Sequence, residues 1–209
     1  MADDFHKPTM FPGGLFEIFE GGVDPAESSR VTHETASALL ARVRHEPDPG
    51  VVDRLVAYTD VHGIAAIAEL WSHATARSLP GALWRIYLLR LMVRESPHET
   101  SYFYQRGSEV IQTIDPVVAG ASAPTGPEEV GALADQILRG VFEGDFAVAL
   151  DRAAAFCRVS AAGCTDVAND LEPVEPARST VLTQRALRLS QLALELTSCA
   201  RLWRHHSLD

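Results

Sequence analysis

The stretch from Gly81 to Glu95, with the sequence GALWRIYLLRLMVRE, constrains the fold more than any other part of the chain. At about 100° of rotation per residue, its apolar side chains leave no continuous polar face, which is typical of a helix covered on most sides. At fifteen residues the stretch is too short to cross a bilayer, and its three arginines would make insertion costly. We therefore expect residues 81–95 to form the central helix of a protein without a membrane span.

Apolar residues recur at helical spacing through most of the chain, and no segment of useful length alternates with the period of a strand. The pattern predicts an all-α bundle or array of about seven to eight helices around residues 81–95. A chain of 209 residues with 46% hydrophobic content can bury one core without a metal or a disulfide. We expect residues 31–209 to form a single helical domain, with a sub-boundary near the turn-rich residues 119–127.

Local start signals position the individual helices, because a capping side chain or a proline at the first helical position marks where a helix begins. The signals are Asp24-Pro25 before an apolar stripe from Thr32 to His45, then Asp48-Pro49, Asp60, Ser96-Pro97 with Glu99, Thr125 with Glu128, Asp145, and finally Ser179 or Thr180. On the last helix Leu182, Leu189, Leu196 and Trp203 recur every seven residues, with Leu192 and Cys199 between them. That spacing predicts a buried seam along one side of a long helix.

Residues 1–30 differ in character from the rest of the chain and are expected to form an irregular arm. Their large apolar side chains alternate with prolines and Gly-Gly pairs; the apolar residues are Phe5, Met10, Phe11, Leu15, Phe16, Ile18 and Phe19. The segment has too many helix breakers for a long helix and too much apolar surface to stay in water. It therefore packs either on its own domain or on a second copy or partner, with LFEIFE (residues 15–20) as one helical turn or a short strand.

The charge and the cysteines restrict partners and location. A net charge of −10 argues against general affinity for nucleic acid or an anionic membrane, since both depend on clustered Lys and Arg. The three cysteines are widely spaced and include no C-x-x-C pair, which favours reduced thiols in the cytoplasm. The first residues, MADDFHKP, carry acids where a secretory signal has basic residues, so we expect no signal peptide.

The arginines of residues 81–95 are the candidate ligand-binding groups. Arg90 and Arg94 lie one turn apart on one side of the predicted helix, and Arg85 points elsewhere. In one interpretation each arginine pairs with an acid from a neighbouring helix or extends to the rim. In the other, Arg90 and Arg94 line a pocket for a carboxylate or phosphate together with Trp84 and Tyr87.

Metal-binding patterns are weak in this sequence. His62 and His73 share a helical side but lie about 16 Å apart by helical rise, so at most Glu69 and His73 could share an ion. A solvent-exposed helix face explains the alignment of His62, Glu69 and His73 better than a metal site does. Glu95 and His98 have the E-x-x-H spacing of di-metal bundles, yet a proline separates them onto different helices. We expect no metal and no cofactor, and no familiar catalytic signature is present.

Two surface features point to protein contacts. Tyr102, Phe103 and Tyr104 are consecutive, so at least one of them is expected to be exposed. The last helix carries an excess of arginine, which favours packing against the acidic body of the protein or of a second copy. The leading hypothesis is a non-enzymatic cytoplasmic interaction or regulatory protein that self-associates through the arm and the last helix. The alternative is a helical protein or enzyme that binds an anionic small molecule, and a third is a metal enzyme using Glu69 and His73.

Overall fold

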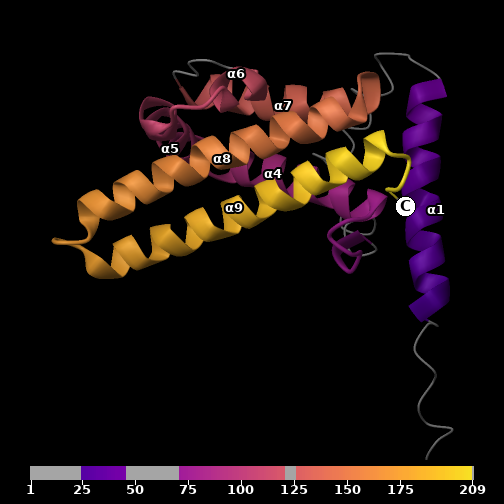
Figure 1. Cartoon of the computed structure of the whole chain (residues 1–209), viewed down its shortest axis with the longest axis horizontal. Coiled ribbons are helices and arrows are strands. Elements are labelled where there is room, and N and C mark those ends of the chain that lie inside the picture. Colours follow the sequence, from indigo (N-terminus) through magenta and orange to yellow (C-terminus); the bar gives the residue numbers. More distant parts are fainter. Residues whose placement is uncertain (1–24, 46–70, 121–125, 209) are drawn as a thin grey trace, which may run out of the picture.

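The computed structural model describes residues 25–45, 71–120 and 126–208, and within these ranges the chain forms seven helices and no strands. This confirms the all-α prediction. The helices are labelled in Figure 1: α1 (Pro25–His45), α4 (Leu79–Glu95), α5 (Pro97–Val110), α6 (Asp115–Ala119), α7 (Pro127–Glu143), α8 (Phe146–Leu171) and α9 (Pro176–Arg204). Within the described ranges, no helix combines the length and hydropathy that a membrane span requires. Most of the predicted arm, and most of the two helices expected after Asp48 and Asp60, lie outside the described residues.

The predicted start signals locate most helices, with corrections at three of them. Asp145 caps α8 as expected, because its side chain accepts hydrogen bonds from the backbone N–H groups of Ala147 and Val148. Helix α9 begins at Pro176 rather than at Ser179 or Thr180, since a proline suits the first turn of a helix, where the N–H has no helical partner.

The second correction concerns α7, whose cap residue is Gly126 in extended backbone geometry rather than Thr125. Pro127 follows at the first helical position, so the proline sets the start of this helix without a side-chain cap. Ser96 lies between α4 and α5 and donates its backbone N–H to the Met92 carbonyl. In this described stretch its hydroxyl forms no capping bond to α5, although Pro97 opens that helix as expected.

Helices α8 and α9 form a long antiparallel hairpin (Figure 1). The predicted seam on α9 faces this hairpin and the core behind it. Leu182, Leu189, Leu196 and Cys199 are buried, while Leu192 and Trp203 are half-buried against the core. Trp203 packs edge-on against Phe146 at the start of α8, with ring centroids 4.7 Å apart. The seven-residue spacing therefore predicted the correct face of α9.

The prediction that residues 81–95 form the central helix is not confirmed. The stretch is helical, as α4, but Leu88 and Leu91 on one side are 39% and 36% exposed. In α8, by contrast, the consecutive residues from Ala153 to Cys157 are all fully buried. Successive residues turn by about 100°, so five buried neighbours cover the whole circumference of the helix. Helix α8 packs against α4, α5, α6, α7 and α9 and occupies the centre of the described structure.

Helices α5 and α8 cross with their backbones in direct contact. A Cβ atom at Gly107 would overlap the Val159 carbonyl oxygen, and a Cβ atom at Gly163 would overlap the Phe103 carbonyl oxygen. The two glycines also face one another, since the Cβ position at each lies close to the backbone nitrogen of the other. The crossing therefore depends on the absence of a side chain at both positions.

Candidate functional site

Two of the predicted site residues, Arg90 and Arg94, contact the same carboxylate. Arg90 is 3% exposed, and its Nε donates to Oδ1 of Asp135 on α7 at 2.6 Å. Arg94 lies one turn further along α4 and donates to Oδ2 of the same residue at 3.3 Å. Asp135 therefore accepts from both guanidiniums. This arrangement matches the first interpretation, in which each arginine pairs with an acid of a neighbouring helix.

The other two predicted residues, Trp84 and Tyr87, contact each other. Their rings stack with centroids 5.8 Å apart and an interplanar angle of 26°. Trp84 is half-buried and packs against the core, and it also lines a surface groove between α4 and α9. The structure thus joins the four residues as two pairs, and in this groove Trp84 is joined by Arg85 rather than by Arg90 or Arg94.

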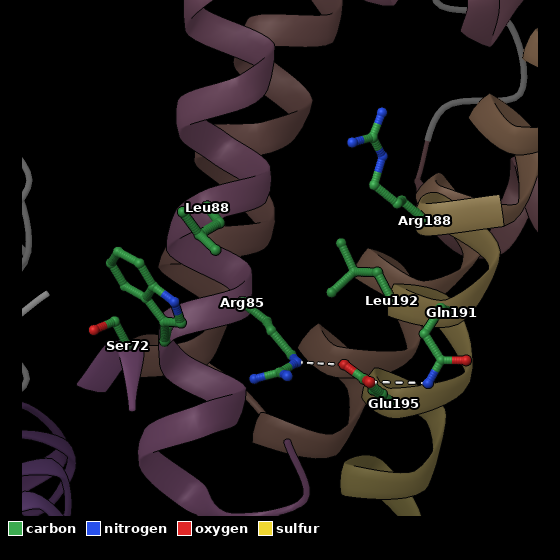
Figure 2. Close-up of a pocket in the computed structure, with 8 residues that line it drawn as sticks. Ser72, Arg85, Leu88, Arg188, Gln191, Leu192 and Glu195 are labelled. Atoms are coloured by element: carbon green, nitrogen blue, oxygen red, sulfur yellow. Dashed lines mark hydrogen bonds and ion pairs between the residues drawn. The ribbon is translucent and has the colours of Figure 1, made fainter. Parts of the chain in front are cut away.

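The groove between α4 and α9, called here the α4–α9 groove, consists of two adjoining hollows of about 290 and 310 Å³. Arg188 and Leu192 of α9 line both hollows. The remaining lining residues are Ser72, Trp84, Arg85, Leu88, Met92, Arg185, Leu189, Gln191 and Glu195. Figure 2 shows the side chains of Arg188 and Leu192 extending from α9 toward α4. Both volumes are at the lower limit for a small-molecule pocket, about 300 Å³.

An ion pair between α4 and α9 lies at one end of the groove. Arg85 donates through Nε to Glu195 at 2.5 Å, and Gln191 donates to the same carboxylate at 2.9 Å (Figure 2). Burial raises the pKa of Glu195. The hydrogen bonds from Gln191 and Arg85, and the charges of Arg85 and Arg77, lower this pKa by more than burial raises it. The net pKa lies below the usual carboxyl range. Glu195 is therefore ionised at neutral pH and holds Arg85 in place.

At the other end of the groove, a second arginine, on α9, is held by an acid. Arg185 donates to Glu99 of α5 at 2.5 Å, and its guanidinium lies 5.0 Å from the centre of the Phe103 ring. Between the two ends lies Arg188, which is exposed and has no hydrogen bond or ion pair to the described residues. The groove therefore presents one arginine without an acid partner there, between apolar side chains and two internal ion pairs.

A buried polar cluster joins α5, α6 and α8 elsewhere in the fold. Asp115 accepts from Arg158 at 2.6 Å and from Thr113 at 2.8 Å. Burial raises the pKa of Asp115, but these hydrogen bonds and the charge of Arg158 lower it by more, so the net pKa is below its usual value. Tyr104 is fully buried, and burial together with the charge of Asp115 raises its pKa to about 12. The cluster attaches the short α6 to α8.

The three cysteines are free and buried, and burial raises the pKa of each thiol. The pKa of Cys157 rises to about 12, and those of Cys164 and Cys199 rise to about 11. Because the thiolate is the reactive form, none of these thiols has the properties of a nucleophile at neutral pH. In residues 25–45, 71–120 and 126–208, no group of three or more His, Cys, Asp or Glu side chains is placed to hold a metal ion. Glu69, part of the weak metal pattern, lies outside these residues.

Sequence reasoning did not anticipate the α4–α9 groove or the cluster around Asp115. The groove brings together residues such as Arg85 and Glu195, which are 110 positions apart in the chain. The arginine excess of α9 was the sequence signal that pointed toward it. Comparison of the chain with family models, curated proteins and solved structures finds no match.

Proposed function

We propose that the protein is a non-enzymatic interaction protein that self-associates, and that the α4–α9 groove is its contact surface. The observation that carries the proposal is the groove itself, which the exposed Leu88 and the half-buried Trp84, Met92 and Leu192 line together with the exposed Arg188. Grooves between two helices that combine apolar residues with a charged rim are common docking sites for peptide segments. Arginine and tryptophan, both present here, are enriched among residues that contribute most to binding.

Several further observations support this proposal. Leu88 in the groove is 39% exposed and Tyr102 at the surface of α5 is 49% exposed, so α4 and α5 carry large side chains suited to a partner. The buried, free thiols fit a reducing compartment, and we propose a cytoplasmic location for the protein.

The test of self-association is the mass of the full chain in solution. Sedimentation equilibrium over a concentration series should give a mass above that of one chain for the natural sequence. Leu88→Glu, which places a negative charge in the groove, should shift the equilibrium toward the monomer. Leu187→Glu is the matched control, because Leu187 is 65% exposed on α9 and does not line the groove. A natural chain that stays monomeric at every concentration would contradict the proposal.

A second candidate function is the binding of an anionic small molecule. Because Arg90 and Arg94 contact Asp135, this function would depend on Arg188, which lines the same hollow as Trp84. Calorimetric titration with inorganic phosphate and with succinate tests it directly. Binding that Arg188→Gln abolishes, while Arg178→Gln on the same helix does not, would support this candidate over the first.

A further inference from the structure

We propose that the occupant of the α4–α9 groove is residues 15–20, LFEIFE, of a second copy of the chain. This inference deepens the proposed function and rests on it, since it names the segment through which the copies associate. Residues 15–20 lie outside the described part of the structure, and their composition relates them to the groove.

Both residues 15–20 and the α4–α9 groove are rich in large apolar side chains. Four of the six residues in the segment are large and apolar: Leu15, Phe16, Ile18 and Phe19. The groove presents the half-buried Trp84, Met92 and Leu192 together with the exposed Leu88. Segments of this composition are unfavourable in water, and side chains of this size suit the groove's two hollows of about 290 and 310 Å³.

The charges are complementary. The segment carries two acids, Glu17 and Glu20, and no basic residue. Around the groove stand four arginines and two glutamates; these are Arg77, Arg85, Arg185, Arg188, Glu99 and Glu195. The excess is positive, and Arg188 has no acid partner in the described residues. Acidic side chains entering the groove would therefore meet the guanidinium of Arg188.

The same charges argue against a symmetric contact between two grooves. Packing the α4–α9 groove of one copy on that of another would place positive surface against positive surface, with the two Arg188 side chains on facing sides. Like charges across an interface lower affinity and select against that partner. An acidic apolar segment avoids this repulsion.

The connection between the segment and α1 is short. Four residues, 21–24, join the segment to Pro25 at the start of α1. Short connections of this kind favour exchange of a segment between copies.

A charge exchange between full-length chains tests the inference. One chain carries Glu17→Arg and Glu20→Arg, and the other carries Arg188→Glu. Each variant alone should associate roughly tenfold more weakly than the natural chain in sedimentation equilibrium. In an equimolar mixture each reversed segment meets a groove of opposite sign, so association should return. Asp3→Arg with Asp4→Arg is the matched control: it makes the same change in net charge outside the segment and should associate normally.

Cross-linking shows which chain supplies the segment. In a chain with Gly21→Cys and Gln191→Cys, which keeps Glu17 and Arg188 in place, a short bismaleimide should produce a covalent dimer, while the natural cysteines are buried and do not compete. A cross-link confined to single chains would overturn the assignment to a second copy. If the chain self-associates but Glu17→Arg with Glu20→Arg has no effect, the inference fails and the proposed function stands. A natural chain that is always monomeric would remove both.

Discussion

Asp135 of α7 is bound by Arg90 and Arg94, two arginines one turn apart on α4, at 2.6 and 3.3 Å. The pair is uneven, because the side chain of Arg90 is 3% exposed while that of Arg94 is 44% exposed. The carboxylate thus compensates a buried charge with one oxygen and an exposed charge with the other. A guanidinium kept out of water is costly unless it is paired and hydrogen-bonded, so Asp135 is important for the packing of α4 on α7.

Replacing Asp135 with alanine should lower the free energy of unfolding by about 3 kcal/mol, because Arg90 loses a carboxylate partner while it stays buried. Glu34→Ala serves as the control. Glu34 pairs with Arg30 on the surface of α1, where both side chains are more than 60% exposed, and such pairs contribute about 0 to 1 kcal/mol. Urea unfolding followed by circular dichroism measures both. Equal losses in the two variants would show that Asp135 does not compensate a buried charge.

Adding a methyl group at the crossing of α5 and α8 should be strongly destabilising. Gly107→Ala and Gly163→Ala each place a Cβ against a backbone carbonyl that cannot move aside, so we expect each to cost about 3 kcal/mol or more. Gly131→Ala is the contrasting change, because nothing lies within 4 Å of its Cβ position. It should stabilise α7 by about 1 kcal/mol through helix propensity. Thermal melting separates these outcomes, and an unchanged melting temperature for Gly163→Ala would contradict the close approach.

The ion pair of Asp115 with Arg158 should make stability depend on pH in the acid range. The folded-state pKa of Asp115 is lowered, so its contribution is complete above the ordinary value of 3.8 and is lost as pH falls toward the folded-state pKa. Asp115→Asn should lower the free energy of unfolding by about 2 kcal/mol at neutral pH. It should also make this free energy depend less steeply on pH below the ordinary pKa of 3.8. Urea titrations between neutral and acid pH test this prediction. Identical pH profiles for the natural protein and Asp115→Asn would show that the Asp115–Arg158 ion pair does not cause the loss of stability in acid.

The three thiols should react slowly while the protein is folded. Burial raises the pKa values of Cys164 and Cys199 from 9.0 to about 11, which lowers the thiolate fraction roughly 100-fold before access is considered. Treatment with a chromogenic disulfide reagent at mildly alkaline pH should release little colour from the native protein and the full amount in denaturant. Fast reaction of one thiol in the native state would show that its helix opens readily.

The start of a helix could be predicted where residues next to it in the sequence determine its position. A capping carboxylate at Asp145 and a proline at position 97 act within one turn, so the starts of α8 and α5 follow from the residues beside them. Tyr102 is 49% exposed beside the buried Phe103 and Tyr104, as three consecutive aromatic residues require.

The centre of the fold could not be predicted from hydrophobicity. Residues 81–95 carry the larger apolar side chains, but α8 is rich in alanine, glycine and cysteine around Ala153–Cys157 and Gly163. Small residues allow neighbouring helices to approach closely, and the approach buries α8 on all sides. A hydropathy pattern records the size and apolarity of side chains rather than how near another backbone comes. The partners of Arg85 and Arg90 likewise lie on other helices, 110 and 45 residues away, and nothing local specifies them.

The contact between α5 and α8 occurs at two points, Gly107 and Gly163, and in each case the neighbour is main chain rather than a side chain that could change rotamer. Two rigid points fix both the separation of the helices and their rotation about each other. These two helices should therefore move as one unit and be the last to exchange their amide hydrogens with deuterium. Any rearrangement on association would then leave α5 and α8 in the same relative position.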